Sequence, residues 1–164
     1  MKNKFLYNQK NKSDLIKDVN NEDFSRITCS FYKYINIKNI QALRDKLFLD
    51  WDALNILGRI YIAFEGINAQ ISIPENNLKQ FKSSLYSYDI FNNLLIKPAI
   101  QEGCSFLKLT IKVKDEIVAY KLNNNNYDMK KVGKHLNYKE FNKAINGGAY
   151  IVDIRNYYEG EIGK

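Results

Sequence analysis

The spacing of apolar residues along the chain changes several times, and each change predicts a secondary-structure element. Residues 27–35 are rich in β-branched and aromatic side chains, which is typical of a strand. Between residues 40 and 54 the apolar positions recur at steps of three and four, which predicts an amphipathic helix capped by Asn39 and ended by Gly58. The stripe consists of Ile40, Leu43, Leu47, Trp51 and Leu54.

The next segment, GRIYIAFEGINAQISIP at residues 58–74, contains two alternating runs around the tetrad 65–68. This pattern predicts a β-hairpin whose first strand alternates Ile60, Ile62 and Phe64 with Tyr61 and Ala63. Pro74 ends the second strand, and an apolar stripe over residues 78–88 predicts another helix. Residues 94–100 predict a short strand. The strict alternation of residues 107–114 predicts an antiparallel strand with one buried side and one basic side.

The order of these elements predicts an α+β fold of the ferredoxin-like type, βαββαβ plus an extra strand, over residues 26–122. Helices on one face of such a sheet leave the other face open. We expect residues 1–25 to be a flexible leader with at most a short helical turn. Residues 123–134, which include four consecutive asparagines, are expected to be a linker.

Residues 135–164 have a different pattern. A short amphipathic helix is predicted at 138–145, closed by Gly147 and Gly148. The apolar run AYIVDI that follows is typical of a strand buried on both faces, as in a parallel sheet. One helix and one strand cannot bury this much apolar surface, so we expect the incomplete start of an α/β domain.

Charge narrows the range of partners. The 164 residues include 25 Lys and Arg against 18 Asp and Glu, giving a formal net charge of +7. A basic balance favours a polyanionic partner, either nucleic acid or an anionic membrane surface. However, 21 of the basic residues are Lys. Because Lys shares A/T-rich codons with the abundant Asn and Ile, nucleotide composition explains the excess equally well.

The same composition argues against several kinds of site. No apolar run approaches the roughly 20 residues of a membrane span. Cys29 and Cys104 form no CxxC motif and are expected to be reduced thiols of a cytoplasmic protein. With His135 as the single histidine, a Cys/His zinc site is not expected, and no other metal or cofactor motif is visible.

Five blocks of sequence carry a family resemblance over residues 30–164. They are SFYKY, GRIYIAFEGINAQISIP, SFLKLTIKVKDEIV, VGKHL and IVDIRNYYEGEIGK, in this order. Together they resemble the rhodanese-related tRNA uridine(34) hydroxylases. The resemblance implies a ferredoxin-like domain followed by a rhodanese domain. It also implies hydroxylation of the wobble uridine of tRNA to 5-hydroxyuridine with molecular oxygen as co-substrate. The partner would be the tRNA anticodon loop in the cytoplasm, with no role for DNA or a membrane.

The resemblance also matches residues near the C-terminus to positions of the family's motifs. Asp153 and Arg155 occupy the Asp-x-Arg positions after the predicted strand 151–154, where a structural, charge-assisted pair is expected. Lys164 stands where the family's Tyr-Glu-x-x-x-Gly-His segment has His. The family's cysteine lies in a loop further downstream, and neither Cys29 nor Cys104 matches it. The catalytic residues are therefore unknown, and we expect the chain to be either a fragment or a truncated product.

Three groups of residues are candidates for substrate binding, and each has two interpretations. Glu65 and Asn68 belong either to a plain hairpin turn or to a pair that contacts a nucleotide base. The basic side of residues 107–114 is either a solvated strand face or a phosphate-binding surface. Its members are Lys108, Lys112 and Lys114, with Lys33 and Arg59 as neighbours. Tyr32, Tyr34 and Tyr61 either stack on unpaired bases or fill the core and surface.

Three functions follow in order of preference. The first is the tRNA hydroxylase that the resemblance implies. The second is an RNA-binding ferredoxin-like module without chemistry, or an inactive truncated product. The third is rhodanese-type sulfur transfer, which needs a cysteine in a position where this chain has none.

Overall fold

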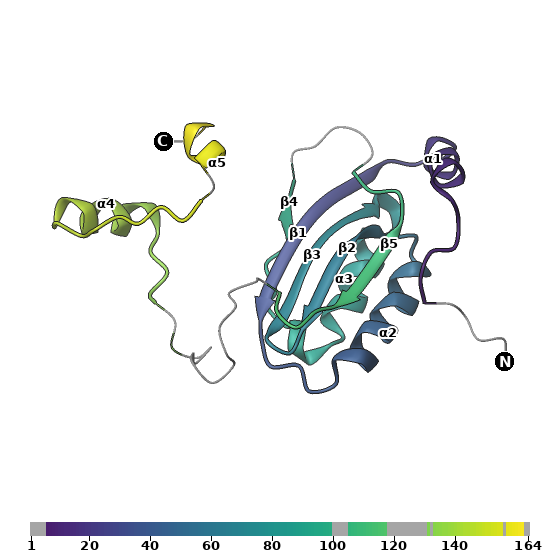
Figure 1. The fold of residues 1–164 in the computed structure, drawn as a ribbon, viewed down its shortest axis with the longest axis horizontal. Helices are drawn as coiled ribbons and strands as arrows, with labels where there is room; N and C mark the ends of the chain where they lie inside the picture. Colours follow the sequence, from purple (N-terminus) through teal and green to yellow (C-terminus); the bar gives the residue numbers. More distant parts are fainter. Residues whose placement is uncertain (1–5, 100–104, 118–130, 132, 156, 163–164) are drawn as a thin grey trace. The chain divides into compact units, whose positions relative to one another are not determined.

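The computed structural model describes residues 6–99, 105–117, 131, 133–155 and 157–162. The chain forms two compact units, residues 1–129 and 130–164 (Figure 1). The division between them falls inside the predicted linker 123–134, most of which lies outside the described residues. The units are described separately below.

The first unit is built on a five-stranded sheet with the strand order β4-β1-β3-β2-β5. The strands are β1 (Arg26–Tyr34), β2 (Leu57–Ala63), β3 (Gly66–Pro74), β4 (Lys97–Pro98) and β5 (Leu109–Val113). The antiparallel order β4-β1-β3-β2 is that of a βαββαβ ferredoxin-like domain, as predicted. β5 is the extra strand at the outer edge of β2.

The predicted direction of β5 is wrong, because β5 pairs with β2 in parallel. β4 and β5 lie at opposite edges of the sheet, and β5 runs opposite to β4. The strict alternation of residues 107–114 suggested an antiparallel strand because antiparallel sheets often have one solvated face. An edge strand with one solvated side shows the same alternation in either direction, so this pattern does not determine the pairing.

Two helices cover one face of the sheet and form the core with it. They are α2 (Ile40–Asp52) and α3 (Leu78–Tyr86), which lie on the same side of the strands (Figure 1). Trp51 of α2 is fully buried, and its ring meets Phe31 and Phe81 edge-on at centroid distances of 6.3 and 5.6 Å. The predicted N-cap is confirmed, since Asn39 accepts a hydrogen bond from the Ala42 amide.

Two glycines allow close contacts between the backbones of neighbouring strands. Gly58 was predicted to end α2, but α2 ends at Asp52 and Gly58 lies within β2. Its φ is +155°, and a Cβ there would lie 2.5 Å from the Gln70 carbonyl oxygen. Gly66 has a φ of +150°, and a Cβ would lie 2.1 Å from the Lys33 carbonyl oxygen. Glycine is required at both positions because the backbone of the neighbouring strand is so close.

The hairpin turn is also tighter than predicted. Ala63 pairs with Gly66, so only Phe64 and Glu65 form the turn, and the rest of the tetrad 65–68 belongs to β3. Ala63 is fully buried and Phe64 is 42% exposed, which reverses the predicted alternation at the end of β2.

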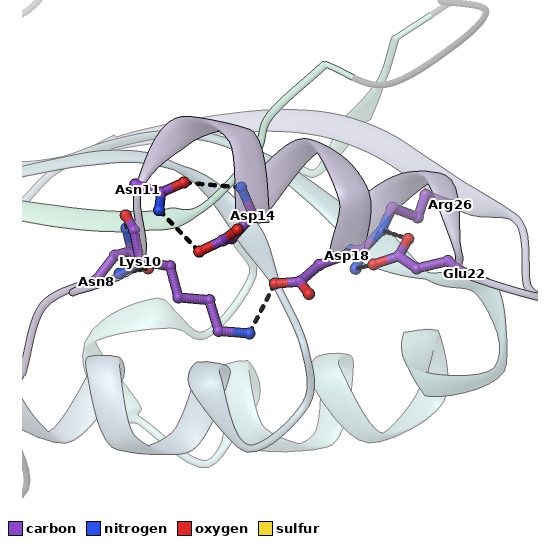
Figure 2. Close-up of polar contacts among 7 residues, drawn as sticks. All are labelled: Asn8, Lys10, Asn11, Asp14, Asp18, Glu22 and Arg26. Carbon is purple, nitrogen blue, oxygen red and sulfur yellow. Dashed lines mark hydrogen bonds and ion pairs between the residues drawn. The ribbon is translucent and has the colours of Figure 1, made fainter.

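The N-terminal segment contains more structure than the predicted leader. Helix α1 (Lys12–Asn20) is capped by Asn11, whose side chain accepts from the Asp14 amide at 2.9 Å (Figure 2). Leu15 is buried, and two ion pairs hold the ends of the segment. Arg26 of β1 binds Glu22 through two 2.6 Å hydrogen bonds, and Lys10 binds Asp18 at 2.7 Å. Local capping and one buried leucine explain why this polar sequence forms a helix.

Two short 3-10 helices flank α3, namely η1 (Glu75–Asn77) and η2 (Asp89–Phe91). The second unit contains α4 (Tyr138–Asn146) and α5 (Tyr157–Ile162). In α4, Asn137 and Glu140 form a reciprocal capping box, and Gly147 follows the last turn as predicted. The predicted strand at 151–154 is wrong, because these residues form no strand and Val152 and Ile154 are 79% and 92% exposed. No neighbouring strand exists among the described residues of this unit.

Candidate nucleic-acid interface

The sheet face opposite α2 and α3 carries polar and aromatic side chains. Side chains alternate between the two faces along each strand, so residues paired across strands share a face. Ile60, Ile62 and Ile67 point into the core, which places Tyr61 and Asn68 on the opposite face. We call this the open face.

Two rows of paired residues cross the open face. The tyrosine row runs through four strands: Lys112, Tyr61, Asn68 and Tyr32. The basic row lies two residues away and runs through all five strands: Thr110, Arg59, Gln70, Ser30 and Lys97. Each row therefore combines residues that are far apart in the sequence.

The side chains of the two rows are cationic, aromatic or uncharged polar. They contain three cationic side chains, two tyrosines and two amides, and none of their members is Asp or Glu. Arg59, Gln70, Lys97 and Lys112 are exposed, and Tyr32 is 57% exposed. Positive charge with accessible aromatic rings suits a ligand with both phosphates and flat bases.

Each tyrosine of the row has a lysine beside its ring. The ammonium of Lys97 lies 5.8 Å from the centroid of the Tyr32 ring, and that of Lys114 lies 5.6 Å from the Tyr61 ring. Tyr34 meets Tyr32 edge-on at 6.4 Å. The rings and the cations are therefore close enough to contact the same nucleotide.

The opposite end of the open face is covered. The Ser105 hydroxyl lies 3.0 Å from the Thr28 hydroxyl, and Ser72, which pairs with Thr28, is only 2% exposed. A ligand on the open face would therefore lie at the end that contains the tyrosine row.

The structure divides the predicted basic residues into two groups. Arg59, Lys112 and Lys114 lie at the open face together with Asn68. Lys33 does not, because it pairs with the buried Ile67 and its ammonium donates to the Asn92 carbonyl at 2.8 Å. Lys108 precedes β5 and lines a cavity of about 900 Å³ beside α1.

Glu65 and Asn68 are also separated. Glu65 is 1% exposed, and its carboxylate accepts a 2.8 Å hydrogen bond from the Ile117 amide. The side chain thus fixes the segment that follows β5 against the hairpin turn. Asn68 is partly exposed in the middle of the tyrosine row. Of this predicted pair, only Asn68 lies where a ligand on the open face could reach it.

The remaining residues singled out in the sequence belong to other parts of the chain. Asp153 and Arg155 form an exposed ion pair, with Oδ2 and Nη2 2.7 Å apart, and the hydrogen bonds from Arg155 lower the pKa of Asp153 to about 2. Burial raises the pKa of the Cys29 thiol to about 11, which keeps it protonated and unreactive. Cys104 lies outside the described residues, and His135 is exposed.

Of the basic row, the sequence singled out only Arg59, and among the four members that it missed, Gln70 and Lys97 have the longest side chains. Gln70 alternates with the buried Ala69 and Ile71, so its position in the strand was a usable signal. Lys97 belongs to a two-residue strand whose pairing with β1 depends on the tertiary fold.

Two kinds of feature are absent from the described part of the chain. No helix there is long and apolar enough to cross a membrane. Nor does that part hold a cluster of three or more His, Cys, Asp or Glu side chains suited to a metal ion.

A family model and several known proteins are similar to this chain, and the similar proteins share one name. Residues 26–117 match the family model described as the UPF0176 acylphosphatase like domain. A protein named tRNA uridine(34) hydroxylase from Leptospira interrogans is 48% identical over 160 residues, covering 96% of this chain and 44% of the relative. Proteins of the same name from Escherichia fergusonii and Enterobacter sp. are 42% and 39% identical, covering 87% and 96% of this chain. The chain spans less than half the length of these curated relatives.

Proposed function

We propose that this protein acts in tRNA modification. The model of the UPF0176 acylphosphatase like domain matches more than half of the chain, so the protein belongs to that family. In this proposal the chain is the N-terminal part of a tRNA uridine(34) hydroxylase. The first unit holds the tRNA on its open face.

One observation supports tRNA binding by the chain itself. The tyrosine row and the basic row together offer cations, amides and aromatic rings on one surface without a carboxylate among them. A solvated strand face explains the charged positions but does not require accessible tyrosines beside the lysines. Phosphates and unpaired bases use all three kinds of side chain.

The proposed reaction is more specific than the names of the relatives. We assign the reaction to hydroxylation of the wobble uridine to 5-hydroxyuridine in the cytoplasm, with molecular oxygen as co-substrate and the anticodon loop as target. Residues 135–164 would begin a rhodanese domain that supplies the catalytic cysteine. The exposed apolar side chains of Val152 and Ile154 are consistent with a segment that packs against further chain.

A second candidate is RNA binding without chemistry. It is favoured by the fact that both rows of the open face lie entirely within the first unit. Sulfur transfer by this chain is not supported by Cys29, whose buried thiol is held protonated.

The binding part of the proposal is tested with an unmodified tRNA transcript and fluorescence anisotropy. The double variant Arg59→Ala/Lys112→Ala should weaken binding about tenfold and reduce the salt dependence by about two counterions. The matched control is Lys79→Ala/Lys82→Ala, which removes the same charge from exposed positions of α3. Equal weakening by both double variants would show that net charge, rather than the open face, binds the tRNA.

The chemical part needs a separate measurement. The protein that carries this chain is incubated with tRNA in air. The tRNA is then digested to nucleosides, which are separated and whose masses are measured by mass spectrometry. The expected product is a uridine heavier by one oxygen atom, formed in air and absent under argon. Binding without this product in either gas would favour the non-catalytic candidate.

A further inference from the structure

The spacing of the tyrosine row suggests which form of RNA the open face accepts. Tyr61 and Tyr32 both pair with Asn68, from opposite sides of β3. Their backbones are therefore two strand spacings apart, roughly 10 Å. Asn68 lies between the two rings and provides both a donor and an acceptor.

This spacing does not match stacked nucleotides. Neighbouring bases in a helical strand are separated by about 3.4 Å, so two of them cannot lie on both rings at once. Bases in a duplex also have their faces covered by the next pair. Bases of an unpaired segment can be splayed apart and stacked singly on aromatic side chains.

Each ring is accompanied by a cation that could hold the phosphate of the same nucleotide. Lys97 lies beside Tyr32 and Lys114 beside Tyr61, at 5.8 and 5.6 Å from the ring centroids. Arg59 is exposed in the basic row, two residues from Tyr61 along β2. The arrangement is thus two similar half-sites, each with a ring and a lysine, on either side of one amide.

We propose that the tyrosine row binds two splayed nucleotides of an unpaired RNA segment, one base on Tyr32 and one on Tyr61, with Asn68 hydrogen-bonded to a base edge. The proposal rests on the proposed function and adds to it a preference for unpaired over paired RNA. It also separates the residues that stack on bases from those that hold phosphates.

The test uses the full chain and two labelled probes, a short single-stranded oligouridylate and an RNA duplex of equal length, at fixed salt. The single strand should bind about tenfold more tightly than the duplex. Tyr32→Ala and Tyr61→Ala should each weaken single-strand binding about tenfold, because each removes one stacking surface. Both variants should change duplex binding by less than about twofold, because the phosphate contacts stay in place.

Two kinds of control make the result specific. Tyr32→Phe and Tyr61→Phe keep the rings and should retain binding within about twofold, since stacking needs no hydroxyl. Tyr138→Ala removes a tyrosine of the second unit that also has a lysine beside it, with Lys139 5.8 Å from the ring centroid, and should have no effect. Thermal melting of each variant shows whether the partly buried Tyr61 is needed for folding.

Each outcome has a definite meaning. Equal affinity for the two probes, or single-strand binding that is unchanged in folded Tyr32→Ala and Tyr61→Ala proteins, would overturn the inference and leave tRNA binding through phosphates intact. Failure of the unaltered chain to bind the single strand, the duplex and tRNA alike would overturn the proposed function as well. If only Tyr61→Ala fails to fold, the inference is judged from the single-strand affinity of Tyr32→Ala relative to that of Tyr32→Phe.

Discussion

The two units contain similar apolar runs, but the run is buried in the first unit and exposed in the second. In the first unit, Ile60 and Ile62 of the run IYIAF are fully buried between the sheet neighbours and the helices. In the second, Val152 and Ile154 of the run AYIVDI are 79% and 92% exposed, and α4 has no buried residue. A hydrophobic run becomes a strand only when a neighbouring strand and a second layer are present to cover it.

The strongest test of this contrast removes one large apolar side chain from each unit. Phe81→Ala in the first unit should reduce the free energy of unfolding by about 4 kcal/mol, since Phe81 is fully buried against Trp51. Val152→Ala should change it by less than about 0.5 kcal/mol. Urea unfolding followed by far-ultraviolet circular dichroism, to which the helices of both units contribute, measures the two effects. Equal effects of the two substitutions would remove the distinction between the units.

The second test compares glycines. Gly66→Ala places a Cβ 2.1 Å from the Lys33 carbonyl oxygen at a φ of +150° and should cost about 3 kcal/mol of stability. Gly133→Ala in the second unit meets no atom within 4 Å and should be neutral in the same urea experiment. A stable Gly66→Ala protein would mean that β1 and β3 can separate without loss, contrary to the pairing described.

The third test concerns the buried carboxylate of the first unit. Glu65→Ala leaves the Ile117 amide without this acceptor and should cost about 2 kcal/mol of stability. Glu65→Gln keeps an oxygen at the same place and should cost less. If the two variants are equally stable in urea, the hydrogen bond to Ile117 is not what fixes the segment after β5.

The smallest expected effect is the titration of the exposed ion pair in the second unit. The pKa of Asp153, about 2, should rise toward its ordinary value of 3.8 in Arg155→Ala, as measured by carboxyl carbon NMR shifts. Because the pKa is lowered, any stabilisation by the pair is present above pH 3.8 and is lost as the pH falls through 2. An unchanged midpoint in Arg155→Ala would assign the shift to another group.

Local patterns predicted the elements of the first unit well and their contacts less well. The stripe from Ile40 to Trp51, the cap at Asn39 and the strand end at Pro74 depend on neighbours in the sequence, and the structure confirms them, although α2 ends at Asp52 and Leu54 lies beyond it. The direction of β5 and the role of Gly58 depend on which strand lies alongside, which no local pattern contains.

The same distinction applies to the candidate site. The basic side of residues 107–114 was visible as an alternation, and it provides Lys112 and Lys114 at the open face. Its assembly into rows with Asn68, Gln70 and Lys97 depends on the registers of four strand pairs. Lys33 was misplaced because a one-residue step along a strand moves a side chain to the other face.

The shortness of β4 has a consequence for how copies of this chain behave in concentrated solution. β4 pairs only with Cys29 and Ser30, so among the described residues no strand pairs with the outer edge of β1 from Phe31 to Tyr34. An unpaired edge is a template for strand addition, and aggregation of β proteins commonly starts there. Its length of four residues and the charge of Lys33 both disfavour such growth. Lengthening this edge or replacing Lys33 with an apolar residue should therefore be avoided when the protein is prepared for study.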